Sequence, residues 1–211
     1  MIEILNDKNS VEVAGKIVSE PEFSHEVYGE GFYNFKIETS RLSENADTLP
    51  VMISERLMDK NLLKLGTVVH ITGQMRSYNN YNEKKARLIL TVFARTIELI
   101  ESTENINPNQ IFLNGFICKP PVYRVTPFGR EIADILIAVN RAYGKSDYIP
   151  CIAWGRNAKF TGKLSVGANI KLWGRIQSRK YQKKNGDNVE ERVAYEVSVS
   201  KMELVNSSNE K

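Results

Sequence analysis

The feature that most constrains this chain is an internal repeat. Six residues recur at an offset of 100, namely Gly15, Pro21, Gly29, Arg41, Pro50 and Arg56, which return as Gly115, Pro121, Gly129, Arg141, Pro150 and Arg156. Later pairs keep the same order at offsets of 101 and 105, namely Gly66 and Gly167, Gly73 and Gly174, Arg87 and Arg192, Glu98 and Glu203, and Leu99 and Leu204. Ordered self-similarity over this length indicates two copies of one domain. We place the first at residues 1–105 and the second at 106–211, with the polar segment 101–109 as a short linker.

Each copy shows the same order of expected elements. In the second copy, runs of alternating apolar residues predict strands at about 111–117, 130–140, 147–154, 168–180 and 191–204. Residues 156–164 are expected to form a short helix, and residues 184–187 are typical of a turn. Gly115 falls inside the first strand, where a strong bend or a close backbone approach is expected. Five short strands and a short helix match a small closed barrel. The sequence therefore predicts an all-β fold of two tandem OB-fold five-stranded barrels, each with a short helix.

Composition and motifs exclude several classes of protein. No apolar run approaches the roughly 18 to 20 residues that span a bilayer, and the first residues lack a signal-peptide pattern, so we expect a soluble cytoplasmic protein with no membrane contact. Cys118 and Cys151 are isolated and are expected to be buried thiols. His25 and His70 lie far apart, the carboxylates of the second copy are scattered, and no phosphate-binding GxxxxGK[ST] loop occurs. We expect no enzyme activity, no metal site and no cofactor.

Charge is unevenly distributed along the chain. Residues 1–105 carry 12 Lys and Arg against 16 Asp and Glu, whereas residues 106–211 carry 17 against 9. A basic half favours a polyanionic partner, because each phosphate that Lys or Arg neutralises releases counterions. A basic face that is merely solvated is the alternative.

Aromatic residues are interleaved with cations in the second copy. Tyr148 and Trp154 share one face of the third expected strand by their even spacing, and Tyr143 lies in the preceding loop. Tyr181 lies near the expected hairpin tip among several Lys and Arg residues. Stacking aromatics beside cations are the means by which proteins hold single-stranded nucleic acid without sequence preference. Trp154 could instead belong to the barrel core, and the sequence does not decide what Trp173 faces.

The candidate site in the second copy therefore has two parts. Its expected stacking residues are Tyr143, Tyr148, Trp154 and Tyr181. Its expected phosphate contacts are Arg124, Arg141, Arg156, Lys171, Arg175, Arg179, Lys180, Lys183 and Lys184.

The first copy differs at the matching positions. Tyr143, Tyr148 and Trp154 correspond at the offset of 100 to Ser43, Thr48 and Ser54. Tyr78 and Tyr81 remain near its expected hairpin, with Arg76, Lys84 and Lys85. Together with its negative net charge, this predicts that the first copy binds nucleic acid weakly or not at all and instead pairs barrels or meets a protein partner.

Several ordered motifs of the second copy resemble the core of bacterial single-stranded DNA-binding proteins. They are NGFICKPPVYRVTPFG at 114–129, YIPCIAWGRNAKF at 148–160, GANIKLWGRIQSRKY at 167–181 and YEVSV at 195–199. The resemblance implies an OB barrel whose stacking aromatics match Tyr143, Tyr148, Trp154 and Tyr181. It also implies a role in DNA replication, recombination or repair, an association with the nucleoid, replication proteins as partners, and a homodimer with four barrels in total.

Two further interpretations stay open at this stage. The family usually ends in an acidic, apolar tip, whereas this sequence ends at Lys211 without one, which favours a specialised or accessory member. One alternative is a replication-restart or assembly protein whose barrels mainly bridge proteins. RNA binding is another, because stacking and phosphate contacts do not by themselves sense the 2′-hydroxyl.

Overall fold

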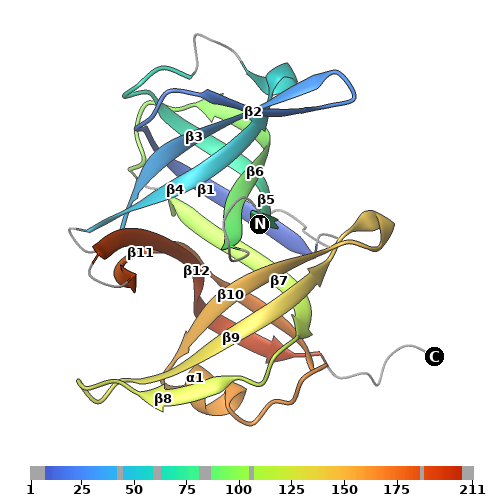
Figure 1. The fold of residues 1–211 in the computed structure, drawn as a ribbon, viewed down its shortest axis with the longest axis vertical. Helices are drawn as coiled ribbons and strands as arrows, with labels where there is room; N and C mark the ends of the chain where they lie inside the picture. Colours follow the sequence, from blue (N-terminus) through green and yellow to red (C-terminus); the bar gives the residue numbers. More distant parts are fainter. Residues whose placement is uncertain are drawn as a thin grey trace.

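The computed structural model of the protein describes residues 8–41, 45–58, 63–80, 87–104, 107–185 and 188–205, with backbone alone at 80, 87, 183–185 and 188. Twelve strands of these residues form one continuous sheet that closes into an upper and a lower barrel (Figure 1). No helix within the described ranges has the length and apolar character needed to cross a lipid bilayer.

The upper barrel is built from the first six strands. These are β1 (Asn9–Ile17), β2 (Glu22–Val27), β3 (Glu30–Ser40), β4 (Ala46–Ser54), β5 (Val68–Asn80) and β6 (Arg87–Leu99), with a 3-10 turn at Glu55–Leu57. Strand β1 pairs with β5, β5 with β6, β6 with β4, β4 with β3, and β3 again with β1, which closes the barrel. Only the β4 and β6 pair is parallel among these described pairings.

The lower barrel repeats this pattern. Its elements are β7 (Asn109–Ile117), β8 (Val122–Val125), β9 (Glu131–Asn140), a 3-10 turn at Ala142–Gly144, β10 (Ser146–Trp154), α1 (Arg156–Thr161), β11 (Asn169–Asn185) and β12 (Asn188–Leu204). The pairings β7 with β11, β11 with β12, β12 with β10, β10 with β9, and β9 with β7 close it in the same way. The predicted all-β fold of two OB-type barrels is confirmed.

The two barrel cores follow the repeat position by position. Val13, Ile37, Leu49 and Ile71 are fully buried in the upper barrel, and their repeat partners Leu113, Ile137, Ile149 and Leu172 are fully buried in the lower one. Because side chains alternate along a strand, these positions place one face of every strand inside. Burial of the apolar area, at about 25 cal/mol per Å², is the main force that holds each barrel closed.

Gly15 and Gly115 allow the first strand of each barrel to belong to two pairings. A Cβ at Gly15 would lie 2.3 Å from the backbone oxygen of Glu38, and one at Gly115 would lie 2.6 Å from that of Ala138. The strand passes from one neighbour to the other at this point. The close approach expected from the sequence at Gly115 is therefore present, and only glycine fits there.

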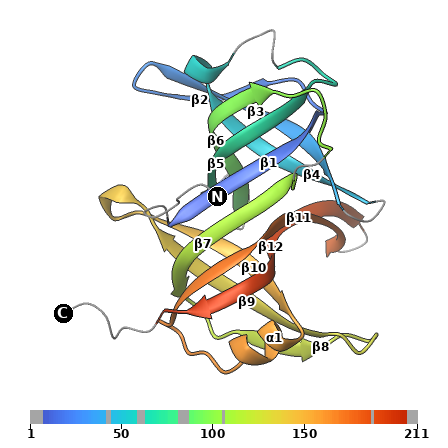
Figure 2. The same cartoon turned by 180° about the vertical axis from the view of Figure 1, so that it is seen from behind.

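Strands β1 and β7 lie side by side and join the barrels (Figure 2). Their antiparallel register is centred on the pair Val11 and Ile111, which are repeat partners 100 residues apart. A register centred on equivalent residues relates the two barrels by a local two-fold axis. Each contact between the barrels on one side of this axis is therefore expected to have a counterpart on the other.

Several boundaries differ from the sequence-based expectation. Strands β2 and β8 were not predicted, because every residue in them is exposed and neither shows a buried alternation. Strands β11 and β12 are longer than expected and α1 is shorter. The expectation that both thiols are buried is right for Cys151 and wrong for Cys118, which is half-buried at the end of β7.

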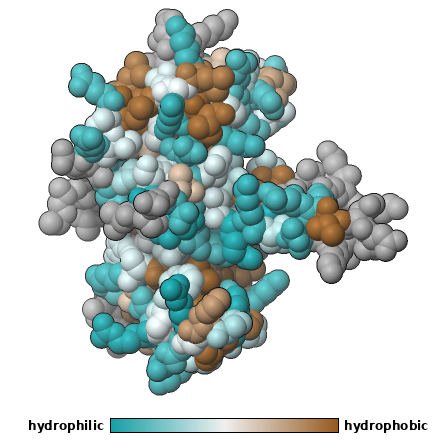
Figure 3. All heavy atoms as spheres, turned by 90° about the vertical axis from the view of Figure 1, so that its left-hand side faces the viewer, coloured by the Kyte–Doolittle hydropathy of each residue, from teal (hydrophilic) through white to brown (hydrophobic). Residues whose placement is uncertain are grey.

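The surface of the upper barrel is partly apolar. Figure 3 shows apolar residues gathered on the upper half of the molecule, between hydrophilic groups. Exposed apolar residues of this barrel include Phe23, Val27, Tyr28 and Tyr78. Scattered exposed apolar groups need no explanation, whereas a contiguous apolar patch marks a surface that meets a partner.

Candidate nucleic-acid interface

Strand β10 presents an alternating outer face. Ile149, Cys151 and Ala153 point inward and are buried, whereas Tyr148 and Trp154 are 47% and 37% exposed. The prediction that Tyr148 and Trp154 share a face is confirmed, and Trp154 is not a core residue. Large aromatic rings that remain accessible on a strand are available to stack on a planar ligand.

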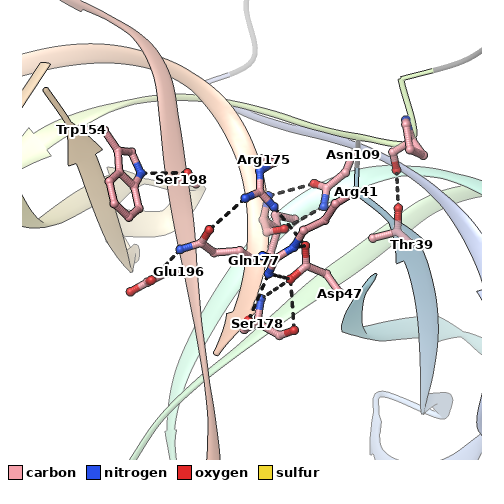
Figure 4. Close-up of polar contacts among 12 residues, drawn as sticks. Thr39, Arg41, Asp47, Asn109, Trp154, Arg175, Gln177, Ser178, Glu196 and Ser198 are labelled. Atoms are coloured by element: carbon pink, nitrogen blue, oxygen red, sulfur yellow. Dashed lines mark hydrogen bonds and ion pairs between the residues drawn. The ribbon is translucent and has the colours of Figure 1, made fainter. Parts of the chain in front are cut away.

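The indole of Trp154 is held in a fixed orientation. Its Nε1 donates a hydrogen bond of 3.1 Å to the Oγ of Ser198 on β12, which leaves the ring faces apolar and the polar edge satisfied (Figure 4). Beside it, a hollow of about 510 Å³ is lined by Arg156 and Phe160 among others, and both of these are exposed. A stacking group, a cation and a concave surface therefore meet at the end of β10.

The β11 and β12 hairpin carries a second aromatic group among charges. The guanidinium of Arg179 lies 5.9 Å from the ring centre of Tyr181, and Tyr181 is 36% exposed. Lys180 lies 3.4 Å from Glu191 and remains largely exposed. The side chains of Lys183 and Lys184, which were also predicted to bind phosphate, lie outside the described residues.

Tyr143 and Tyr148 lie at the other end of the face, near the upper barrel. Tyr143 is almost completely exposed in the turn before β10, with φ at 60°, a left-handed conformation that is uncommon for residues other than glycine. The backbone N–H of Tyr148 donates to the Oγ of Ser77 on β5 at 2.7 Å. The four predicted aromatics therefore differ in their surroundings: Tyr143 and Tyr148 lie next to the upper barrel, whereas Trp154 contacts Ser198 and Tyr181 lies beside Arg179, both within the lower barrel.

The predicted cations also divide by their surroundings. Arg124 forms an exposed ion pair with Asp134 at 2.8 Å, and Lys171 is half-buried along a hollow of about 460 Å³ that it shares with Trp173. Arg141 and Arg175 instead lie in ion pairs of 3.1 Å with Asp147 and Asp47. The sequence did not show this, because Asp47 lies 128 residues before Arg175.

A reciprocal set of contacts joins the barrels around two buried aspartates. Asp47 on β4 accepts hydrogen bonds from Ser178 of the lower barrel at 2.7 Å from the backbone N–H and 3.1 Å from Oγ (Figure 4). Across the local two-fold axis, Asp147 on β10 accepts a bond of 2.7 Å from the backbone N–H of Ser77 in the upper barrel. Both carboxylates are fully buried. Each barrel thus inserts one carboxylate into the other.

Arginines neutralise both carboxylates. Asp47 lies 2.5 Å from Arg41 and 3.1 Å from Arg175, and Asp147 lies 3.1 Å from both Arg76 and Arg141. Desolvation raises the pKa of Asp47, but the hydrogen bonds and charge of Arg41 and the bonds from Ser178 outweigh it, so the pKa lies below its ordinary value. Asp47 is therefore ionised at neutral pH and works as a structural link between the barrels.

Trp173 lies apart from these contacts, on the sheet that joins the barrels. Its ring packs against Phe112 on β7 with ring centres 5.1 Å apart, and the Nζ of Lys201 lies 4.5 Å above it. These neighbours explain its partial burial. Trp173 therefore lies at a different position on the lower barrel from Trp154, so the fluorescence of the two tryptophans reports on different surfaces.

The upper barrel carries aromatic residues that the sequence analysis did not consider. Thr48 and Ser54 replace aromatic groups as expected, and Ser43, Tyr81, Lys84 and Lys85 lie outside the described residues. On the outer face, however, His25, Phe32 and Phe93 form a run of neighbouring rings. Phe93 is the repeat partner of Ser198. A comparison of every strand position with its repeat partner, beyond the matches of Tyr143, Tyr148 and Trp154, would have revealed this aromatic residue.

Comparison with known proteins agrees with this geometry. The model of the family described as "Single-strand binding protein family" matches residues 108–205. A "Single-stranded DNA-binding protein" of Clostridium tetani is 37% identical over 98 residues, which are 42% of this chain and 68% of that protein. This chain belongs to the single-strand binding protein family.

Other family members and solved structures extend the comparison. "Single-stranded DNA-binding protein B" of Bacillus subtilis is 34% identical over 88 residues, 38% of this chain and 78% of that protein. The crystal structure of wild-type single-stranded DNA binding protein from Thermus aquaticus covers 96% of this chain and 95% of its own at 18% identity with a TM-score of 0.76, so the shared fold includes both barrels. A dimeric structure of the N-terminal domain of PriB protein from Thermoanaerobacter tencongensis is 49% identical and covers 46% of this chain and all of its own, with a TM-score of 0.39.

Proposed function

We propose that this protein binds and protects single-stranded DNA without strong sequence preference during DNA replication, recombination or repair. In this proposal it acts in the cytoplasm near the nucleoid and catalyses no reaction. The lower barrel, with a domain boundary between residues 105 and 106, is the main binding unit. Membership of the single-strand binding protein family supports this function, and the family match lies over the lower barrel.

The observation that carries the proposal is the setting of Trp154. Its ring is accessible, its orientation is fixed by Ser198, and Arg156 lies beside it in the same hollow. An apolar ring face with a fixed polar edge suits a base, and a neighbouring cation suits the phosphate that follows. A purely structural tryptophan would have its ring inside the barrel.

Binding in this proposal combines stacking with charge. Trp154 and Tyr181 stack on bases, at about 1 to 3 kcal/mol for each base engaged. Arg156, Arg179 and Lys180 contact phosphates, and Lys171, Lys183, Lys184 and Arg124 extend the basic surface. Arg141 and Arg175 hold the buried aspartates, so their first role is to position the two barrels. No cofactor is needed, because protection follows from occupancy alone.

Tryptophan fluorescence tests the proposal directly. The only tryptophans are Trp154 and Trp173, so Trp173→Phe leaves Trp154 as the sole reporter and Trp154→Phe leaves Trp173. Titration with oligo-dT should quench the wild type and the Trp173→Phe variant strongly and the Trp154→Phe variant much less. A matched duplex should quench weakly, and added salt should weaken binding. Absence of both quenching and competition at low salt would overturn the proposed function.

We also propose a homodimer with four barrels. The sheet that joins the barrels exposes Phe116 and carries a hollow that Phe112 and Trp173 help to line, which supports a further apolar contact on this face. Sedimentation equilibrium should then give about twice the chain mass of 24.0 kDa. A single species at the chain mass would refute the dimer without affecting DNA binding.

A further inference from the structure

We propose that the upper barrel carries a second site for single-stranded nucleic acid, built from different aromatic residues and completed by Tyr143 and Tyr148 of the lower barrel. The inference rests on the proposed function, since it names a further surface for the same class of ligand. It reverses the expectation from the sequence that the first copy has lost its stacking groups. Four features of the structure support it.

The first feature is an aromatic exchange between neighbouring strands. In the lower barrel, β10 carries Trp154 and β12 carries Ser198, and the indole donates to that hydroxyl. In the upper barrel the corresponding positions are Ser54 on β4 and Phe93 on β6, because Met52 pairs with Phe93 as Ile152 pairs with Ser198. The aromatic ring has therefore moved by one strand and has not been lost.

The second feature is a run of rings that continues from Phe93. Phe32 on β3 lies 5.9 Å from Phe93 between ring centres, and His25 on β2 stacks on Phe32 at 5.1 Å with an angle of 15° between the planes. Phe32 lies directly opposite Ser54, so the run occupies the place that Trp154 has in the lower barrel. Phe32 and Phe93 are only partly buried and His25 is exposed, whereas the inward-facing Phe35 of the same barrel is buried. Successive accessible rings of this kind suit successive bases.

The third feature is a basic hollow between the barrels, next to the rings. A cavity of about 420 Å³ is lined by the four cations Lys8, Arg76, Arg95 and Arg141, together with polar groups. The guanidinium of Arg76 also lies 5.9 Å from the ring centre of Phe93, which makes hollow and rings continuous. Burial lowers the pKa of Arg76 against the opposing effect of Asp147, and the charges of Arg141 and Arg95 lower it further. An excess of positive charge in a hollow is the setting in which a phosphate binds.

Among the described residues, the cations that line this hollow are not all repeated across the local two-fold axis. Lys8 corresponds to Pro108 in the repeat, and Arg95 corresponds to Ser200, because Ala94 pairs with Gly73 as Val199 pairs with Gly174. Two of the four cations are therefore replaced by uncharged residues on the other side. This asymmetry indicates that the cations are not simply needed to join the barrels, which the aspartate contacts achieve on both sides.

The fourth feature is the position of the two tyrosines. Arg141 and Ala142 line the hollow, and the next residue, Tyr143, is 98% exposed at its edge. Tyr148 follows Asp147, which contacts Arg76 and Ser77 of the upper barrel. A single strand bound by Tyr143 and Tyr148 would therefore have its phosphates over the basic hollow and its next bases at Phe93, Phe32 and His25.

Removal of charge from the hollow tests the proposal without changing a core. The double variant Lys8→Gln/Arg95→Gln should bind an end-labelled dT of about 35 nucleotides more weakly, and its slope of log K against log salt should fall by about 1.4, or 0.7 for each phosphate that is no longer neutralised. Tryptophan quenching by a dT of about 10 nucleotides, which fits one barrel, should be unchanged. Lys16→Gln/Lys64→Gln removes two exposed charges from the same barrel and serves as the matched control, with no expected change in slope.

A reporter placed in the ring run provides the second test. In the background Trp154→Phe/Trp173→Phe, the substitution Phe93→Trp should give fluorescence that long oligo-dT quenches, whereas Leu65→Trp on an exposed loop of the same barrel should not respond. The second site would be overturned, and the proposed function left intact, if the wild type binds but two results are negative. These are an unchanged slope of log K against log salt for Lys8→Gln/Arg95→Gln and no fluorescence quenching of the Phe93→Trp reporter. A wild type that binds no single strand would instead refute the proposed function.

Discussion

Replacement of Asp47 by Asn tests whether the buried aspartates join the barrels. The carboxylate is fully buried and accepts bonds from Arg41 at 2.7 and 2.5 Å and from Ser178 at 2.7 and 3.1 Å, with Arg175 at 3.1 Å. Asparagine keeps the size and one oxygen for Ser178, but it removes the charge. The two guanidinium groups would then face each other without a counter-ion.

The expected loss of stability follows from the exposure of the partners. Removal of one member of a fully buried ion pair costs about 3 to 5 kcal/mol. Here the arginine side chains remain 26% and 38% exposed, so water can solvate part of the released charge. We therefore expect Asp47→Asn to lower the free energy of unfolding by about 2 to 3 kcal/mol, which lowers Tm by roughly 4 to 12 °C for a chain of this size.

Urea unfolding followed by circular dichroism and by tryptophan fluorescence measures this loss. The control is Asp134→Asn, which breaks the exposed pair with Arg124 and should cost about 0 to 1 kcal/mol. Asp147→Asn, on the other side of the two-fold axis, should behave like Asp47→Asn. If Asp47→Asn were no more destabilising than Asp134→Asn, the aspartates would not be the link between the barrels.

Three further predictions follow from described contacts. The pKa of Asp47 is lowered in the folded state, so its contribution to stability is present above the ordinary carboxyl pKa of about 4 and is lost as the pH falls through the folded pKa. The difference in Tm between wild type and Asp47→Asn should therefore shrink below about pH 4. A constant difference down to about pH 2 would contradict the assignment. Gly174→Ala should destabilise the chain by about 1 to 3 kcal/mol in urea unfolding, because its Cβ would lie 2.2 Å from the backbone oxygen of Ser198; an unchanged midpoint would show that the strands can separate freely. Burial raises the pKa of the Cys151 thiol, so a thiol reagent should modify Cys118 in the folded protein and Cys151 only after unfolding. Mass spectrometry of partly modified protein measures this order, and modification of Cys151 before Cys118 would contradict the prediction.

The repeat made the architecture predictable from the sequence. Gly15 and Gly115, together with apolar positions such as Ile37 and Ile137, recur because each barrel needs the same close approach and the same inward face. The outer face of β10 was predictable for the same reason, since Tyr148 and Trp154 differ by an even number of positions. The repeat and the strand periodicity therefore account for the fold and for the shared face of Tyr148 and Trp154.

Contacts between the barrels were not predictable in this way. Arg76 and Arg175 both face an aspartate of the other barrel, yet they do not align in the repeat: Gln74 precedes Arg76 by two positions, whereas Gln177 follows Arg175 by two. The order of Arg and Gln is thus reversed while the pairing is kept. The exchange of aromatic groups between Ser54 and Phe93 and between Trp154 and Ser198 escaped for the same reason, because partners on adjacent strands can trade roles without any signal at one position.

The replacement of Lys8 and Arg95 by uncharged repeat partners on the other side of the two-fold axis has a consequence for the direction in which a strand binds. A strand of nucleic acid has different 5′ and 3′ ends, and a receptor made of two identical halves offers the same surface to either orientation. In this chain the halves are covalently joined and have diverged, so Lys8 and Arg95 mark one of the two passages between the barrels. A strand that crosses this passage runs from the tyrosines to the phenylalanines. A strand bound in the opposite 5′-to-3′ direction presents its sugars and phosphates to the same groups in the reverse orientation. A fused pair of barrels can thus impose a polarity on its ligand that a symmetric pair cannot.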